Sequence, residues 1–139
     1  MKKIAAFALL GTLLCGSAQA YMNAPVISGG VGEEGRAAIE KIQSNYSVKT
    51  IFTGEGGIYL SDVDVQIVDR NGNVMVSNVS QGPMLLAALP PGRYILQAAA
   101  DGYVKKQDFT VGRNGLKTLY VRFPVHDDNG GDYERNRSL

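Results

Sequence analysis

Leu89-Pro90-Pro91-Gly92-Arg93-Tyr94-Ile95-Leu96-Gln97-Ala98 is the stretch that decides the fold, because it joins a tight turn directly to a long apolar strand. Pro91 fixes the φ angle that the second position of a turn needs, and Gly92 can adopt the positive φ that follows. After the turn, apolar side chains recur at every second residue, and this period of two predicts a strand with one buried face. The side chains expected on that face are Tyr94, Leu96 and Ala98.

Segments with the same alternation lie on both sides of this strand and are bounded by turn residues. They cover residues 47–53, 63–67, 74–76, 84–89, 93–100, 103–111 and 116–123. Asn71-Gly72, between the second and third segments, is the strongest short hairpin signal that a sequence offers. About seven such segments predict an all-β fold, a seven-strand antiparallel β-sandwich whose alternating apolar side chains face each other. We expect its interior to contain Val65, Ile67, Tyr94, Leu96 and Val121.

One short N-terminal helix is expected ahead of the sandwich, over residues 33–46. Glu33 and Glu34 suit the first turn, where the helix dipole favours acids, and the helix has an apolar stripe made of Ile39, Ile42 and Tyr46. The glycine-rich residues 26–32 are expected to be a flexible lead-in. The predicted organisation is a signal peptide over 1–20, lead-in and helix over 21–46, the sandwich over 47–124 and a disordered polar tail over 125–139.

The first 20 residues have the features of a secretory signal peptide. Met1-Lys2-Lys3 is a basic head, and residues 4–14 form an apolar run that is too short to span a bilayer comfortably. Ser17-Ala18-Gln19-Ala20 ends in the small-x-small pattern of a cleavage site. We therefore predict export through the Sec route with cleavage after Ala20, and a periplasmic or secreted protein.

Cys15 raises the alternative of a lipidated cysteine, which needs a small residue before it, whereas Leu14 stands there. Cleavage after Ala20 leaves a chain without cysteine, so its core must provide stability without disulfides. Removing Lys2 and Lys3 leaves 12 of the 14 basic residues against 13 acidic ones, a net charge of −1. This mixed charge indicates no nucleic-acid partner, and we expect no membrane insertion after cleavage.

The sequence offers no set of residues for catalysis, cofactor binding or metal binding. Its one histidine, His126, follows the last predicted strand, so a serine–histidine–acid relay would depend on the tail. Four tail residues resemble part of a calcium loop, but Ser138 occupies the twelfth position, where such a loop needs a bidentate acid. These residues are Asp127, Asp128, Asn129 and Asp132. We predict that the protein is not an enzyme and has no catalytic residues, no cofactor and no metal site.

One predicted surface is unusually apolar for a sheet in water. If Leu85, Ala87 and Leu89 face the core, the side chains between them, Met84, Leu86 and Ala88, point outward. Ile95 points outward from the next strand. Our first interpretation is that the apolar stripe of the N-terminal helix covers this face. The alternative is that these four residues form an interaction surface for a protein partner or a second copy of the chain.

From Gly57 to Phe123 the chain resembles carboxypeptidase regulatory-like domains, which have a transthyretin-like (prealbumin-like) sandwich fold. The matching segments are Ser61-Asp62-Val63-Asp64-Val65, Asp69-Arg70-Asn71-Gly72-Asn73, Leu89-Pro90-Pro91-Gly92-Arg93-Tyr94, Asp101-Gly102-Tyr103 and Lys117-Thr118-Leu119-Tyr120-Val121. With its signal peptide and acidic helix, the whole chain is similar to small secreted bacterial envelope proteins, of uncharacterised function, that carry this domain. These motifs are turns and strands, so the resemblance implies a fold and not a reaction.

The sequence therefore predicts a non-catalytic periplasmic or secreted module that binds or supports another envelope component through a sheet face, a sheet edge or its end loops. Self-association is the other expected kind of partnership. One alternative is a small transthyretin-like hydrolase, although the histidine-rich site of the hydroxyisourate hydrolases in that group is not matched. The other alternative is a calcium- or carbohydrate-binding module, for which the sequence offers the acidic tail and Tyr59, Tyr103 and Tyr120.

Overall fold

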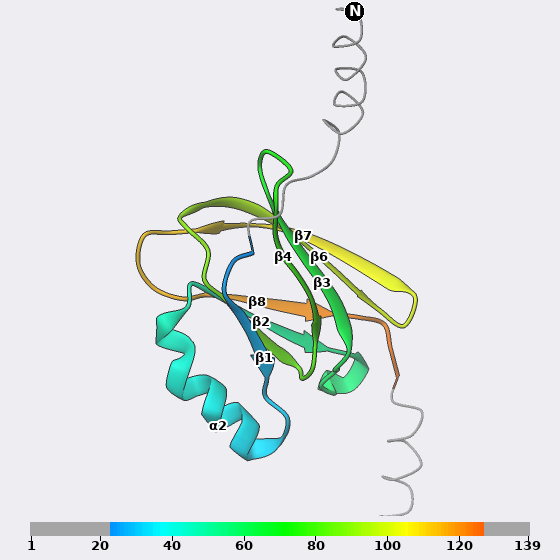
Figure 1. Cartoon of the computed structure of the whole chain (residues 1–139). Coiled ribbons are helices and arrows are strands. Elements are labelled where there is room, and N and C mark those ends of the chain that lie inside the picture. Colours follow the sequence, from blue (N-terminus) through cyan, green and yellow to red (C-terminus); the bar gives the residue numbers. More distant parts are fainter. Residues whose placement is uncertain (1–22, 127–139) are drawn as a thin grey trace, which may run out of the picture.

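Two four-stranded sheets packed face to face form the body of the protein in the computed structural model, which describes residues 23–126 (Figure 1). Sheet A has the strand order β4-β3-β6-β7, and sheet B has the order β1-β5-β2-β8. The strands are β1 (Val26–Gly29), β2 (Val48–Thr53), β3 (Val63–Asp69), β4 (Val74–Ser80), β5 (Met84–Ala87), β6 (Gly92–Ala100), β7 (Tyr103–Val111) and β8 (Lys117–Arg122). The signal peptide and most of the tail predicted from the sequence lie outside the described residues.

The strand that follows the proline-glycine turn is a central strand of sheet A, as predicted. Along β6, buried residues alternate with exposed ones, and β6 pairs with β3 on one side and β7 on the other. The five residues expected to share an interior belong to one buried cluster between the sheets. They are Val65, Ile67, Tyr94, Leu96 and Val121. The β-sandwich prediction is confirmed at this level, because alternate apolar side chains from both sheets form a common core.

Two details of the predicted sandwich are wrong: the described residues contain eight strands, and not all of them are antiparallel. Sheet A is antiparallel throughout, but β2 and β8 pair in parallel, with Val48 opposite Lys117. The cause is the connection over residues 112–116, which carries the chain from β7 in sheet A to β8 in sheet B. At the edge of sheet B, β8 then runs in the same direction as its neighbour β2.

The eighth strand is β1, within the stretch predicted to be a flexible lead-in. It pairs antiparallel with β5, from Val26 opposite Ala87 to Gly29 opposite Met84. Gly30, at a φ of 92°, then turns the chain towards the helix, and the side chain of Met84 packs against its backbone. The glycines there serve close packing and a turn, which is why composition alone suggested a flexible segment.

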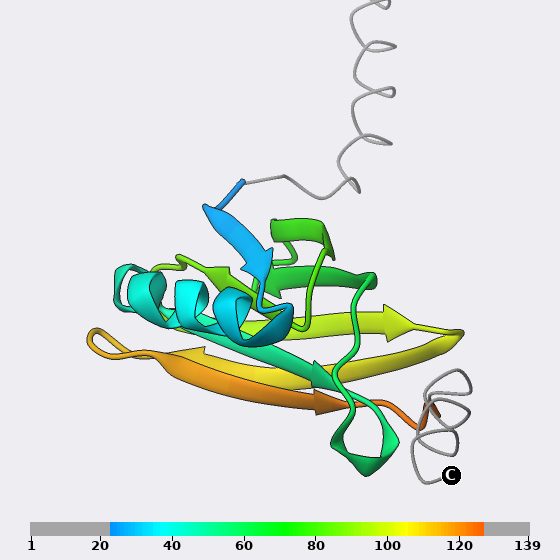
Figure 2. The same cartoon turned by 90° about the horizontal axis from the view of Figure 1, so that it is seen from below.

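The helix α2 (Gly32–Ile42) covers part of the outer face of sheet B, as the sequence predicted. Ile39 forms a buried cluster with Met84 and Leu86 of β5, and Ile42, Tyr46 and Ile51 pack around it. The helix ends four residues before the predicted boundary, and a 3-10 turn, η1 (Gln43–Asn45), follows it. Figure 2 shows α2 lying against this side of the sandwich. Sheet B is therefore packed on both faces.

The turns at one end of sheet A are held by side-chain hydrogen bonds. In the β3–β4 hairpin, the Asp69 carboxylate accepts hydrogen bonds from the backbone N–H of Asn71 and of Asn73, each 2.9 Å long, and another from Asn73 Nδ2. The Asn73 side chain is the main cause of the lowered pKa of Asp69. In the proline-glycine turn, the Tyr94 hydroxyl donates to the carbonyl of Pro90 at 2.6 Å. These contacts fix the loops from which the neighbouring side chains project.

Thr50, at the centre of β2, is a testable weak point of the core. Its side chain is fully buried, and its hydroxyl has no hydrogen-bond partner among residues 23–126. A buried hydroxyl without a partner loses its bonds to water and gains nothing in return. We expect Thr50→Val, which keeps the shape, to raise the free energy of unfolding by about 1 kcal/mol in urea denaturation. Thr53→Val, at a half-buried position of the same strand, should change it by less than about 0.5 kcal/mol; an equal gain in both variants would contradict the explanation.

Candidate functional site

The four residues of the predicted interaction surface do not lie together. Met84 and Leu86 are buried under α2, with exposed fractions of 6% and 0%. Ala88 lies just beyond β5, half-buried, and its N–H donates to the Pro25 carbonyl at 2.9 Å. Ile95 lies in β6 of the other sheet and is 39% exposed. The premise that segments 84–89 and 93–100 are neighbours in one sheet is wrong, because the turn between them takes the chain from sheet B to sheet A.

The outer face of sheet A is the larger candidate surface, and we call it the open face. No helix of residues 23–126 covers it, whereas α2 covers part of sheet B. The strand registers place alternate residues of all four strands on it. They are Ser77 and Val79 of β4, Asp64, Gln66 and Val68 of β3, Arg93, Ile95, Gln97 and Ala99 of β6, and Val104, Lys106, Asp108 and Thr110 of β7.

One end of the open face is a row of four residues that we call the apolar row, because three of them are apolar and the fourth is Asp64. Val79, Asp64, Ala99 and Val104 are opposite one another across the four strands. Val79 is 51% exposed and Val104 is 56% exposed, which is high for aliphatic side chains in a sheet. Tyr103, 46% exposed, begins β7 at the tip of the β6–β7 hairpin, which projects past the other strands in Figures 1 and 2.

The middle of the open face is polar and shallowly hollowed. A depression of about 560 Å³ lies between β4, β3 and β6, and its lining includes the neutral side chains of Gln66, Ser77 and Gln97. Short or neutral side chains in the centre leave room for a partner to approach the sheet, and one charged residue, Asp64, also lines the depression. The arrangement suits a flat contact with another macromolecule better than it suits enclosure of a small substrate.

Alternation in the sequence contained the signal for this face. Val76 and Phe109 belong to the core, and Val79 and Val104, an odd number of residues away in their strands, therefore point outward and are exposed. The sequence could not show that this face stays uncovered, because that depends on which sheet the helix packs against.

The described residues contain little that points to chemistry at a reactive centre. No three His, Cys, Asp or Glu side chains within residues 23–126 are arranged to hold a metal ion. His126, exposed at the end of this range, stands apart from the core. Burial raises the pKa of Tyr94, with a contribution from nearby Asp69, so its hydroxyl stays protonated at neutral pH and donates to Pro90. The acidic tail residues proposed for calcium lie outside the described range, from Asp127 onward.

No family model matches the chain, and no curated protein matches it. Within the part of the chain that the structure describes, no helix is long and apolar enough to cross a membrane.

Proposed function

We propose that the protein is a non-catalytic binding module that contacts another component of the cell envelope through the open face of sheet A. The observation that carries this proposal is the difference between the two sheets. Sheet B buries Met84 and Leu86 beneath α2, whereas sheet A leaves Val79, Ile95 and Val104 in water. Exposed aliphatic side chains that share one flat face are typical of sites where proteins meet.

The partner that suits this surface is a protein with a flat, largely uncharged contact area. The hollow at the centre of the open face is lined mainly by neutral side chains, and the apolar row across the four strands lies at one side of it. Burial of Val79, Ala99 and Val104 on association would be favourable in the same way as burial in a core. Asp64, in the same row, would need a hydrogen-bond donor or a basic group on the partner. Neutral amides such as Gln66 and Gln97 can exchange hydrogen bonds with water for hydrogen bonds with a partner.

The proposal also covers the domain family of the protein and its location in the cell. The resemblance to transthyretin-like, carboxypeptidase regulatory-like domains is supported by the place of the Leu89–Tyr94 motif, which crosses between the sheets and opens the central strand β6. Export to the periplasm or beyond is supported by the basic, apolar and small-residue order of residues 1–20. A hydrolase of the same fold is the alternative, and turnover by the purified protein in a hydrolase screen would favour it.

Site-specific photo-crosslinking in intact cells tests the open face directly. We expect a crosslinker at Val79 or Val104 to trap the same partner, because both residues flank the apolar row of that face. Tyr120 is the matched control, since it is 70% exposed but lies in β8 of sheet B. Mass spectrometry of the products identifies the partner, and a second copy of the chain is one expected identity. Equal yields of the same product from Tyr120 would contradict the proposal.

Val104→Asp gives the complementary test. The side chain is 56% exposed, so the substitution should change the free energy of unfolding by less than about 0.5 kcal/mol. It should nevertheless abolish the crosslink formed from Val79, because the contact would then have to bury a second carboxylate in the row that already contains Asp64. Unchanged crosslinking in a folded Val104→Asp variant would rule out the open face as the contact.

A further inference from the structure

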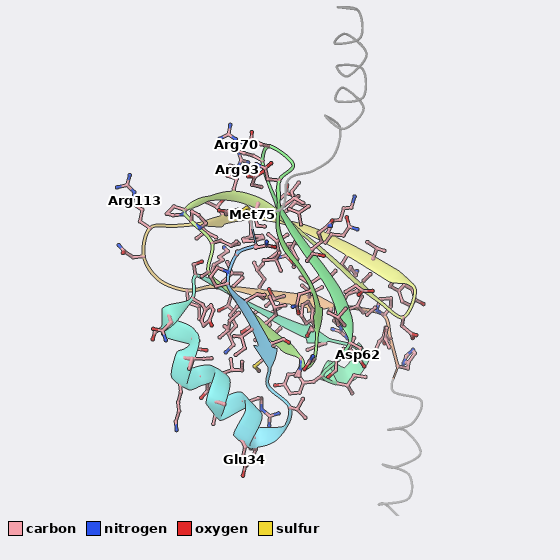
Figure 3. All side chains as sticks on the ribbon, viewed as in Figure 1. Glu34, Asp62, Arg70, Met75, Arg93 and Arg113 are labelled. Carbon is pink, nitrogen blue, oxygen red and sulfur yellow. The ribbon has the colours of Figure 1, made fainter. Side chains whose placement is uncertain are left out.

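Three arginines that are far apart in the sequence lie at one end of the sandwich. Figure 3 shows Arg70, Arg93 and Arg113 at one end of the sandwich, whereas Glu34 and Asp62 lie towards the other end. The arginines come from three places: the β3–β4 hairpin, the start of β6 and the turn after β7. Strand order thus gathers positive charge at the end where these turns meet, although the chain as a whole is nearly neutral.

Arg70 and Arg93 lie beside each other at this end. Asp69 is opposite Tyr94 in the last pair of the β3–β6 ladder, so the next residues along, Arg70 and Arg93, are cross-strand neighbours. Both are exposed, and the two are close together in Figure 3. Like charges directly opposite each other on neighbouring strands are destabilising. The repulsion between Arg70 and Arg93 therefore lowers the stability of the fold, and the strand pairing does not require both charges.

Among residues 23–126, no carboxylate oxygen lies within 4.0 Å of a guanidinium nitrogen of Arg70 or Arg93, so neither arginine forms an ion pair there. Asp69 is adjacent in sequence, but its carboxylate accepts hydrogen bonds from Asn71 and Asn73 instead. Asp108 lies on the same face, opposite Ile95 and therefore diagonal to Arg93, and it lines the same hollow without forming an ion pair with either arginine. The two guanidinium groups thus keep their hydrogen-bond donors available at the surface.

A hollow of about 490 Å³ lies between these arginines. Its lining is Arg70, Arg93, Tyr94, Ile95, Asp108, Phe109 and Thr110. Tyr94 and Phe109 alternate with these outward residues, and their own rings stack in the core on the other side of sheet A, with centroids 5.6 Å apart. We propose that this hollow binds a singly charged oxyanion, a carboxylate or a phosphodiester, held between the guanidinium groups of Arg70 and Arg93.

The chemistry of the hollow supports that ligand class. The planar fork of an arginine matches the paired oxygens of a carboxylate or phosphate, and two such forks facing one anion give strong charge-assisted hydrogen bonds. A bound anion also removes the repulsion between the two guanidinium groups. Asp108 at the rim opposes a second negative charge, and Ile95 offers contact to an apolar group attached to the anion. This site does not depend on a protein partner at the apolar row of the open face.

Titration of the purified protein with acetate and, separately, dimethyl phosphate tests the site, using sodium chloride at equal ionic strength as the reference. In NMR spectra we expect saturable shifts of amides around Arg93 and Asp108, with a Kd on the order of millimolar. The two probes distinguish a carboxylate from a phosphodiester source, and saturation by either one supports the site. If both probes caused only shifts that do not saturate and that resemble those caused by chloride, the proposed site would be ruled out.

Three arginine substitutions distinguish specific binding of an oxyanion in the hollow from general electrostatic attraction to the end of the sandwich where the arginines lie. Arg70→Gln and Arg93→Gln should each weaken binding about tenfold, because each removes charge-assisted hydrogen bonds. Arg113→Gln is the matched control: Arg113 is exposed at the same end but does not line this hollow, so binding should stay within about twofold. Equal weakening by all three variants would show non-specific attraction and contradict the proposal.

The unfolding temperature tests the repulsion between the two arginines separately from ligand binding. Without oxyanion and at low salt, Arg93→Gln should unfold at a higher temperature than the parent protein, because the cross-strand repulsion is gone. With saturating oxyanion, the parent protein should gain stability and Arg93→Gln should gain much less. A lower unfolding temperature of Arg93→Gln without ligand would show that the arginine pair stabilises the fold, and would overturn the interpretation.

Discussion

Leu86→Ala is expected to lower the free energy of unfolding by about 2 to 5 kcal/mol. Leu86 is fully buried on the outer side of β5, where it packs with Met84 and with Ile39 of α2. Truncation removes apolar contacts and leaves a cavity that α2 and β5 can close only partly. Guanidinium denaturation followed by circular dichroism measures the loss, and binding of an apolar dye should increase if α2 detaches from the sheet.

Ile95→Ala is the matched control for that experiment, because it removes an aliphatic side chain from the outward face of sheet A. Ile95 is 39% exposed and has no helix over it, so the loss should be less than about 1 kcal/mol. A large difference between the two variants follows from the helix covering one sheet and not the other. Equal losses would contradict the assignment of Leu86 to a second core. Deleting residues 21–46 is a less specific test, since it also removes β1.

Much of sheet A could be predicted from local sequence signals. The alternation along β6, the Asn71-Gly72 hairpin and the inward direction of Phe109 each depend on residues that are close in sequence. Hairpins of this kind make consecutive strands neighbours, and they account for the β3–β4 and β6–β7 pairs, whereas β3 and β6 pair across a long separation in the sequence. Alternation shows which side of each strand is buried, and the five predicted core residues, including Val121 of sheet B, lie in one cluster.

Sheet B was harder to predict, because its pairings join residues far apart in the chain. β2 lies between β5 and β8, and no short turn connects it to either. β1 has only four residues, of which Ile27 is 40% exposed, so it has no alternating pattern of its own. It is a strand because β5 offers it a free edge. Such a strand is defined by its partner and not by its composition.

The candidate sites show the same limit. The sequence identified an excess of outward apolar residues and named the helix that covers part of it, and the packing of Ile39 on Leu86 confirms that interpretation. It did not separate Ile95 from Met84, because that needs the point at which the chain crosses between sheets. Nor did it bring Arg70 beside Arg93, since their proximity follows from the β3–β6 register.

Gly82→Ala is expected to destabilise the protein by about 3 kcal/mol, or more if the sheets cannot shift. Gly82 lies between β4 and β5, against the backbone of β1. A Cβ at this position would lie 2.6 Å from the carbonyl carbon of Gly29 and closer still to its oxygen. Backbone cannot rotate away as a side chain can, so β1 would have to move from β5 and lose the bond from the Gln81 N–H to Ser28 Oγ. Thermal unfolding and amide hydrogen exchange of residues 26–29 measure both effects.

Gly72→Ala separates this lack of space from the ordinary conformational role of glycine. Gly72 has a φ of 85°, where an added side chain is strained, but nothing lies within 4 Å of the added Cβ. The cost there should be about 1 to 2 kcal/mol and should stay within the β3–β4 hairpin. Gly82, by contrast, does not have the positive φ that favours glycine, so its loss should appear as faster exchange in β1. If Gly82→Ala cost no more than Gly72→Ala and left exchange in β1 unchanged, then β1 would not be packed against the β4–β5 connection as the structure places it.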